Sequence, residues 1–324
     1  MPLWNADCSR VTARFALAAI AASLLLPAAP ATAVVVHPNT LLGTPDPDAP
    51  PPPGDDPGWG HLGRFSDGSA IYLGTNPGGE HWILTANHLA GPSTFEIDQG
   101  SYATDISVSF TNPGGSVADL RAWRLVGGPT LPPLWDIAST TPSMGTDARL
   151  LLHGRPEAAF TCWNALWNVI GCGGSPAHRG YPWLVGVVKR WGTNQVSLSG
   201  AAIDPLKIQL GINEEIFATD FDDLGTVLET QAASADSGGG LFVWNGSQWE
   251  LAGITLYIVN PSDVNRPAAV AALDEDSTLY ADLAYYRPQI LSSTGVVLPE
   301  PGVGALAAGV ALLAGLARRR SGRR

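Results

Sequence analysis

The stretch Ala235-Asp236-Ser237-Gly238-Gly239-Gly240 places one serine between an acidic residue and three glycines. A serine hydroxyl is a poor nucleophile at neutral pH. It needs a histidine to accept its proton and a buried carboxylate to fix the tautomer of that histidine. Taken alone, Asp-Ser-Gly-Gly is also good turn chemistry in any loop. The interpretation of Ser237 therefore depends on partners elsewhere in the chain.

Two upstream segments offer these partners. Trp82–His88 is an apolar, strand-like run that ends in small residues and a histidine, and Asp136 lies inside the apolar stretch Leu134–Ala138. Each residue alone is more often structural, His88 as a buried or surface histidine and Asp136 as a solvated or capping carboxylate. Found together in the order histidine, aspartate, serine, they predict a catalytic triad.

These three contexts resemble the chymotrypsin/trypsin-like serine proteases, whose motifs read T-A-A-H, D-I-A and G-D-S-G-G. The resemblance covers roughly Gly58 to Pro288. It implies that Ser237 is the nucleophile, His88 the general base and then acid, and Asp136 the orienting carboxylate. It also implies an oxyanion hole formed by the backbone N–H groups of Ala235 and Ser237.

The same resemblance places the base of the substrate pocket at Gln231, and its wall at Thr255, Leu256, Tyr257 and Ile258. A pocket that selects Lys or Arg needs a buried carboxylate, and none stands at the predicted base, so a trypsin-like preference is disfavoured. The bulk of Ile258 would narrow the pocket. The implied substrate is a protein or peptide, and no cofactor or metal is implied.

The composition suits a β-rich, loop-rich protein, because the 324 residues include 37 glycines, 27 prolines and 11 tryptophans but only 18 Lys plus Arg. Short β-branched or aromatic runs predict strands at Ser69–Leu73, Ile106–Phe110, Trp183–Val188, Gly240–Trp244 and Leu251–Ile254. Asn245-Gly246 predicts a hairpin turn between the last two runs. The implied fold is all-β, with two antiparallel β-barrels: His88 and Asp136 in the first, Ser237 in the second, and the active site in the cleft between them.

The N-terminal segment is typical of a secretory signal peptide over residues 1–33. Arg10 and Arg14 precede the apolar run Phe15–Leu26, and Ala31-Thr32-Ala33 offers a signal peptidase site. We therefore expect an exported protein. The Pro- and Asp-rich residues 34–57 predict an extended, disordered linker outside the fold.

The C-terminal segment 299–324 resembles the PEP-CTERM sorting signal. Pro299-Glu300-Pro301 precedes the apolar stretch Val303–Ala317, and an arginine cluster ends the chain. The resemblance implies processing by an exosortase-like enzyme in a Gram-negative envelope, with transient inner-membrane contact through the apolar segment. An ordinary membrane anchor or a buried tail helix are the alternatives. Residues 289–298 are expected to link this segment to the protease domain, 58–288.

Charge and cysteine content restrict the remaining possibilities. The formal net charge of −11, without a basic patch, argues against nucleic acid as a partner. Cys162 and Cys172 are the two cysteines outside the signal peptide, and in an exported chain we expect them to form a disulfide. A zinc site is less favoured, because only two sulfurs are present with no paired histidines nearby.

Three classes of function remain open from the sequence. The leading one is an exported serine endopeptidase. The second is a catalytically weak or inactive protein of the same fold that binds ligands at the cell surface; it is kept open by Ala235, which stands where the family usually has glycine. The third is a structural component of the extracellular matrix, suggested by the sorting segment alone.

Overall fold

The computed structural model describes residues 35–36, 45–89, 91–222, 225–259, 270–273 and 276–299, with 35–36 and 270–273 described by their backbone alone. The chain divides into two compact units, Met1–Ala31 and Thr32–Arg324, and everything below concerns the second. The predicted signal peptide and the apolar tail after Pro299 lie outside the described residues. Within those residues, no helix combines the length and the apolar character needed to cross a membrane.

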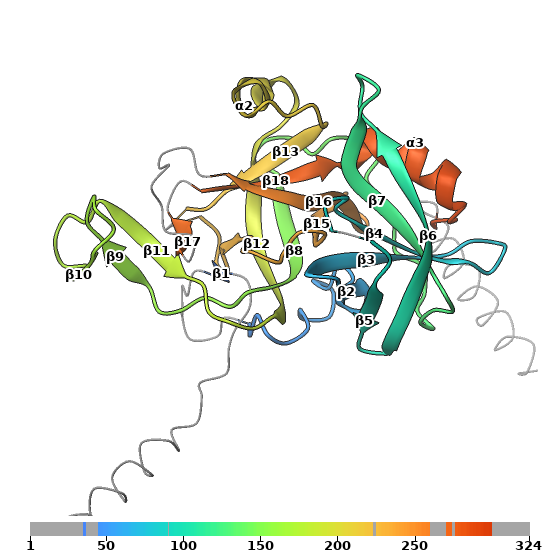
Figure 1. Cartoon of the computed structure of the whole chain (residues 1–324), viewed down its shortest axis with the longest axis horizontal. Coiled ribbons are helices and arrows are strands. Elements are labelled where there is room, and N and C mark those ends of the chain that lie inside the picture. The colour runs from blue at the N-terminus through green and yellow to red at the C-terminus, as the bar shows by residue number, and fades with distance from the viewer. Residues whose placement is uncertain are drawn as a thin grey trace, which may run out of the picture. The chain divides into compact units, whose positions relative to one another are not determined.

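The first of two closed β-barrels is built from six antiparallel strands in the order β2-β3-β4-β7-β6-β5. Its strands are β2 (Leu62–Phe65), β3 (Gly68–Thr75), β4 (His81–Thr85), β5 (Thr94–Ile97), β6 (Gly100–Thr111) and β7 (Val117–Leu125). All of β3 except its last residue is buried. Figure 1 shows this barrel beside the second one, which β2 and β3 contact.

The second barrel also closes with six antiparallel strands, in the order β12-β13-β18-β16-β15-β8. They are β8 (Asp147–Gly154), β12 (Val188–Leu198), β13 (Ile216–Asp220), β15 (Gly240–Trp244), β16 (Trp249–Val259) and β18 (Ser277–Asp282). The predicted hairpin at Asn245-Gly246 joins β15 to β16, with the Asn245 N–H donating to the Gln248 carbonyl at 3.0 Å. The predicted all-β fold with two antiparallel barrels is therefore confirmed.

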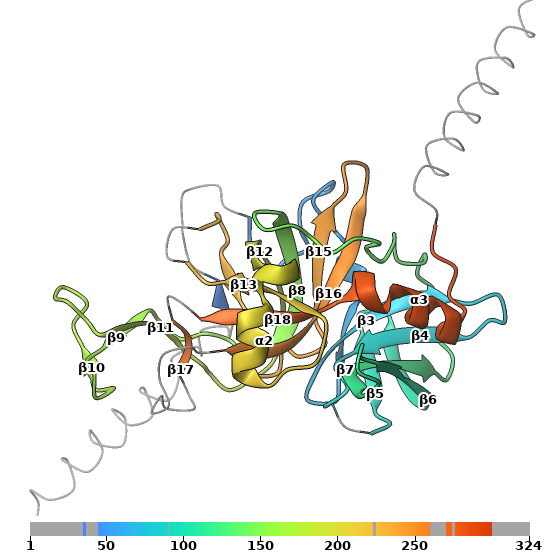
Figure 2. The same cartoon turned by 90° about the horizontal axis from the view of Figure 1, so that it is seen from above.

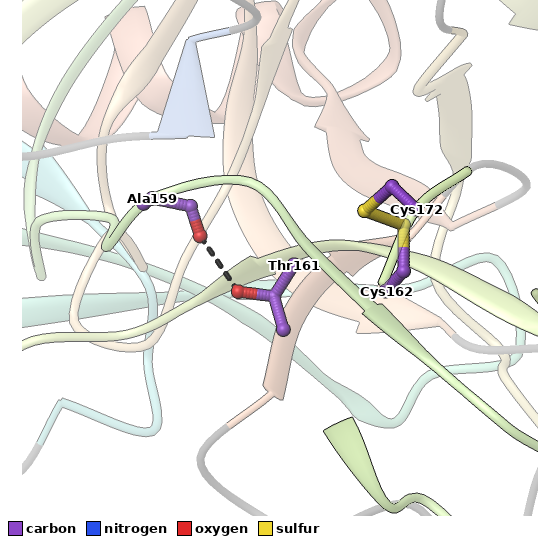
Figure 3. Close-up of a disulfide and its surroundings, with 4 residues drawn as sticks. All are labelled: Ala159, Thr161, Cys162 and Cys172. Atoms are coloured by element: carbon purple, nitrogen blue, oxygen red, sulfur yellow. Dashed lines mark hydrogen bonds between the residues drawn. A yellow bond between two sulfur atoms is a disulfide. The ribbon is translucent and has the colours of Figure 1, made fainter. Parts of the chain in front are cut away.

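A smaller sheet extends from the second barrel. It has the order β10-β9-β11-β17 and consists of β9 (Thr161–Trp163), β10 (Val169–Ile170), β11 (His178–Pro182) and β17 (Val270–Leu273). The predicted disulfide between Cys162 and Cys172 is present and joins β9 to the chain just after β10, with a Cα–Cα distance of 5.3 Å (Figure 3). We call residues 160–182 the arm, because β9 and β10 project away from both barrels in two perpendicular views (Figures 1 and 2).

Short helices and one further strand pair complete the described part of the chain. They are η1 (Trp59–His61), η2 (Gly200–Ala202), α2 (Asp204–Leu210), α3 (Leu283–Thr294), and the pair β1 (Val35–Val36) with β14 (Thr230–Gln231). The Asp282 side chain caps the N-terminus of α3 by accepting a hydrogen bond from the Ala284 N–H.

Three sequence-based expectations differ from the structure. The run Trp183–Val188 is not a strand: β12 begins only at Val188, and the preceding residues form an exposed connection from the arm. Residues 289–298 are not a linker, because α3 continues to Thr294 and the side chains of Ile290, Val296 and Leu298 are buried. Hydrophobic burial thus fixes the end of the fold beyond the predicted boundary.

The Pro/Asp-rich segment also differs from the expected disordered linker over residues 45–57, which we call the strap. The strap lies against the second barrel: the Trp191 indole N–H donates to the Ala49 carbonyl at 2.9 Å, and Pro51 and Pro57 are buried. Asp48 pairs with Arg190, whose side chain also donates to both carboxylate oxygens of Glu157 at 2.7 and 2.6 Å. Prolines reduce the entropy lost on ordering, and these contacts hold the segment in place.

Candidate active site

His88 lies in the turn that follows β4 and forms two hydrogen bonds with the carboxylate of Asp119. Its backbone N–H donates to Oδ1 of Asp119 at 2.8 Å, and its Nδ1 donates to Oδ2 of the same residue at 2.7 Å. Asp119 is nearly buried, whereas the His88 side chain is 41% exposed. The contact fixes the proton on Nδ1 and leaves Nε2 as the proton acceptor.

The register of the first barrel explains why Asp119 takes this position. Strand β4 pairs with β7 so that Thr85 lies opposite Arg121. Asp119 lies two residues before Arg121 on β7, and His88 lies three residues after Thr85, so the antiparallel pairing brings the turn after β4 to the Asp119 carboxylate.

The sequence-based assignment of Asp136 as the orienting carboxylate is therefore corrected. The Asp136 side chain is buried where the chain passes from the first barrel to the second, and its Oδ1 accepts from Nη2 of Arg287 on α3 at 3.0 Å. The same oxygen accepts from the Ile137 N–H at 2.7 Å. Asp136 thus anchors α3 to the connection between the barrels, and among the described residues the carboxylate that contacts His88 is Asp119.

A pattern in the sequence could have identified Asp119. Ala118-Asp119-Leu120-Arg121-Ala122-Trp123-Arg124-Leu125 puts an acid near the start of a strand-like run downstream of His88. The Asp-Ile-Ala string at Asp136 matches the family motif more closely, but β7, which carries Asp119, is a strand that pairs with β4 beside the histidine.

Ser237 lies in the tight turn before β15, where the second barrel touches the first. Its carbonyl oxygen accepts from the Ser69 N–H of β3 at 2.7 Å. A Cβ placed on Gly68 would lie 2.6 Å from that oxygen and 2.7 Å from Cδ1 of Leu89, the residue after the histidine. The turn that carries Ser237 and the turn that carries His88 therefore both lie against Gly68, at the start of β3.

The turn that carries Ser237 has the backbone conformation expected of an oxyanion hole. Ala235 adopts φ +79°, a left-handed value that disfavours any residue with a Cβ. The backbone N–H groups of Asp236, Gly238 and Gly239 all have backbone acceptors. Those of Ala235 and Ser237 have none among the described residues. Two unpaired donors beside a candidate nucleophile can bind a developing oxyanion.

Asp236, between these two donors, is fully buried. One of its oxygens accepts from the Ala233 N–H at 2.5 Å, while the other has no partner among the described residues. Burial raises the pKa of the Asp236 carboxyl well above its usual range, and the positive charge of Arg190 opposes that rise. The carboxyl shapes the turn from within the protein and does not face a substrate.

Tyr257, on the second barrel, contacts the His88–Asp119 pair. Its ring stacks against the imidazole of His88, with centroids 6.2 Å apart and planes inclined by 25°. Burial raises the pKa of the Tyr257 hydroxyl above its usual range, and the charge of Asp119 together with a hydrogen bond to it adds to the rise. Tyr257 and Asp119 therefore restrict the orientation of His88 from two sides.

A cavity of about 690 Å³ opens beside Tyr257. Its lining comes from the end of β16, the β6–β7 connection and the chain after α2: Asn112, Ser116, Val117, Leu210, Gly211, Ile212, Asn213, Glu214, Tyr257, Ile258 and Val259. Of the residues expected to form the substrate pocket, Tyr257 and Ile258 line this cavity. Gln231, Thr255 and Leu256 are buried beneath the surface.

Comparisons with known proteins add a likeness of fold. No protein-family model and no curated protein matches the sequence. Among solved structures, the chain is similar to neuropsin, a serine protease expressed in the limbic system of mouse brain. The identity is 15% and the TM-score 0.46, over 72% of this chain and 94% of neuropsin. It is also similar to kallikrein-related peptidase 10, at 13% identity and a TM-score of 0.44, over 76% of this chain and 98% of that one. The roles of individual residues rest on this chain's own contacts.

The two aspartates should respond differently to the loss of charge. Asp119→Asn should slow the reaction of Ser237 with a fluorophosphonate probe by about 10³-fold or more, because the histidine loses the carboxylate that fixes its tautomer. Asp136→Asn should change that rate by about tenfold or less and lower the free energy of unfolding by about 1–3 kcal/mol. The measurements are the labelling rates and the urea unfolding of both variants. A larger loss of rate in Asp136→Asn than in Asp119→Asn would make Asp136 the orienting carboxylate.

Ala235→Gly should stabilise the protein. A left-handed residue with a Cβ costs about 1–2 kcal/mol, and the extra freedom of glycine in the unfolded chain returns about 0.4–1 kcal/mol of that. We expect a net gain of about 0.5 kcal/mol in urea unfolding. The matched control is Ala233→Gly, at a position outside the left-handed region, which should lose about 0.5–1 kcal/mol. Equal losses in both variants would contradict strain at Ala235.

Proposed function

We propose that the protein is an exported serine endopeptidase that cleaves protein or peptide substrates through an acyl-enzyme. The proposal is carried by the His88–Asp119 pair and by the Ser237 turn, where the N–H groups of Ala235 and Ser237 have no acceptor among the described residues. In this assignment Asp119 replaces Asp136 as the third member of the triad.

The groups present can perform each step of peptide hydrolysis. Nε2 of His88 removes the hydroxyl proton while Oγ of Ser237 attacks the substrate carbonyl carbon, and Asp119 stabilises the imidazolium that forms. The N–H groups of Ala235 and Ser237 bind the oxyanion. His88 then protonates the leaving amine, and a water molecule repeats the sequence to release the acyl group.

A preference for Lys or Arg is disfavoured, because such a side chain would lack a carboxylate at Gln231, the predicted base of the pocket. Gln231 and Thr255 are buried beneath the surface, so neither is assigned a contact with the substrate.

The alternative is a binding protein of the same fold without turnover. It rested on Ala235, because a Cβ at this position disfavours the backbone orientation of an oxyanion hole. The positive φ of Ala235 and its unpaired N–H argue for the enzyme instead.

Covalent labelling tests the enzyme directly. The full chain should react with a fluorophosphonate probe at Ser237, identified by peptide mass, and Ser237→Ala should abolish the label. Because triad members act as a unit, Ser237→Ala, His88→Ala and the double variant should show similarly low residual peptidase activity. Labelling that survives in His88→Ala at the wild-type rate would contradict an activated serine and favour the binding protein.

The processing of the two ends completes the proposal. Signal peptidase would release residues 1–33 on export, and an exosortase-like enzyme would act at Pro299-Glu300-Pro301 after transient arrest of the tail in the inner membrane. The product would be extracellular or attached to the surface of a Gram-negative cell. Mass spectrometry of the protein from its host should find a C-terminus without the arginine cluster. An intact Arg324 end held stably in the inner membrane would instead indicate a permanent anchor.

A further inference from the structure

The arm carries apolar side chains that no other part of the described chain covers. Leu166 is 80% exposed and Val169 is 71% exposed, and Ile170 beside them is also exposed. They lie in and next to the turn between β9 and β10, which we call the tip and define as residues 164–170. In both views the tip is among the parts of the arm farthest from the barrels (Figures 1 and 2).

Charge is missing from the β9–β10 hairpin although the protein as a whole is acidic. No Asp, Glu, Lys or Arg occurs between Glu157 and Arg179, in a chain of formal net charge −11, and Arg179 on β11 is the one such residue of the arm. Exposed aliphatic side chains on a soluble surface are normally scattered singly among charges. Here they are gathered on an uncharged hairpin, which indicates a partner that is itself apolar.

Four backbone donors of the tip have acceptors within the tip itself. The N–H groups of Leu166 and Asn168 donate to the side-chain oxygen of Asn164 at 2.9 and 3.0 Å. The Trp167 N–H donates to the Asn164 carbonyl at 2.9 Å, and the Asn164 N–H donates to the Asn168 carbonyl at 3.0 Å. A turn that needs little water for its amides can enter an apolar medium at low cost.

Covalent and aromatic contacts hold the tip in this shape. The Cys162–Cys172 disulfide closes the base of the β9–β10 hairpin, close to the hydrogen bond from the Thr161 hydroxyl to the Ala159 carbonyl at 2.8 Å (Figure 3). The Trp167 ring stacks on His178, with centroids 4.0 Å apart and planes inclined by 1°. Little conformational entropy therefore remains to be lost when the tip binds.

We propose that the tip of the arm inserts into the interfacial region of a lipid bilayer. A specific protein interface buries about 800 Å² on each partner, more than a narrow convex tip with three aliphatic side chains presents. A bilayer accepts any convex apolar tip, and tryptophan is enriched at its interface. The lack of charge on the β9–β10 hairpin commits the proposal to zwitterionic lipid, bound through apolar contact and not through headgroup charge.

This inference is independent of the proposed peptidase activity. The apolar tail could also bind lipid, so the experiment has to locate the contact. Hydrogen–deuterium exchange of the full chain should show peptides from residues 160–172 exchanging at least about fivefold more slowly when phosphatidylcholine vesicles are added, because the tip leaves water. The protection should persist in high salt, since no charge is involved.

Leu166→Asp is the decisive variant, because its exposed side chain contributes little to folding. It should abolish the vesicle-dependent protection of residues 160–172 and weaken vesicle binding at least about tenfold through the cost of burying a charge. The matched control is Val126→Asp, at a 58% exposed position at the end of β7, which should bind as the wild type does. Thermal melting checks that both variants fold.

Three outcomes would overturn the proposal. One is unchanged exchange of the tip on adding vesicles, which would assign any lipid binding to the tail. Another is equal protection in wild type and Leu166→Asp. The third is protection of the tip that rises with protein concentration in the absence of lipid, which would make a second copy of the chain its partner.

Discussion

The hydrogen bond from the Ser69 N–H to the Ser237 carbonyl is the contact on which the candidate site depends, because it joins the two barrels at the turn that carries Ser237. The approach is so close that a Cβ on Gly238 would lie 1.9 Å from the Ser69 carbonyl oxygen. That same oxygen accepts from the Thr85 hydroxyl at 2.6 Å, three residues before His88. One short segment of β3 thus positions both the serine turn and the histidine turn, and no side chain can be added between them without separating the barrels.

Local chemistry explains which parts of the site could be predicted from the sequence. Ser237 and His88 stand out because glycines, small residues and an apolar strand surround them within a few positions. The role of Asp119 depends on which part of β7 lies opposite the end of β4, and register is a property of the folded sheet rather than of a short motif. Asp136 has the local sequence context of the family motif, but in the folded chain its carboxylate accepts a hydrogen bond from Arg287 of α3 instead of from His88.

The same distinction applies to the segments that flank the barrels. A run of prolines and aspartates such as residues 45–57 has the composition of a disordered linker. Composition alone does not reveal that Asp48 pairs with Arg190 of β12, or that the Ala49 carbonyl accepts a hydrogen bond from Trp191. Residues 289–298 show the converse, because burial of Ile290 and Leu298 extends the fold past the point where the motifs end.

Tyr257 is the contribution of the second barrel to the surroundings of His88 and Asp119, which both belong to the first barrel. Its ring lies against His88 and its hydroxyl interacts with Asp119, so the imidazole is held between a carboxylate and an aromatic face. Tyr257 also lines the cavity of about 690 Å³. A ligand that enters this cavity would therefore touch Tyr257. Because Tyr257 also contacts His88, binding in the cavity would be coupled to the geometry of the His88–Asp119 pair.

Arg190 interacts both with the strap and with the turn that carries Ser237. Arg190 is buried and shared between Asp48 and Glu157, and its charge is also the one that opposes the raised pKa of Asp236. Burial raises the pKa of Glu157 as well. A carboxyl with a raised pKa holds its proton to a higher pH in the folded chain than in the unfolded chain, so folding stability falls as the pH rises between those two values. Within that pH window the Arg190 charge counteracts the loss, because it favours the ionised forms of Asp236 and Glu157. The strap, which has the composition of a linker, thereby contacts the arginine whose charge acts on the carboxyl next to Ser237.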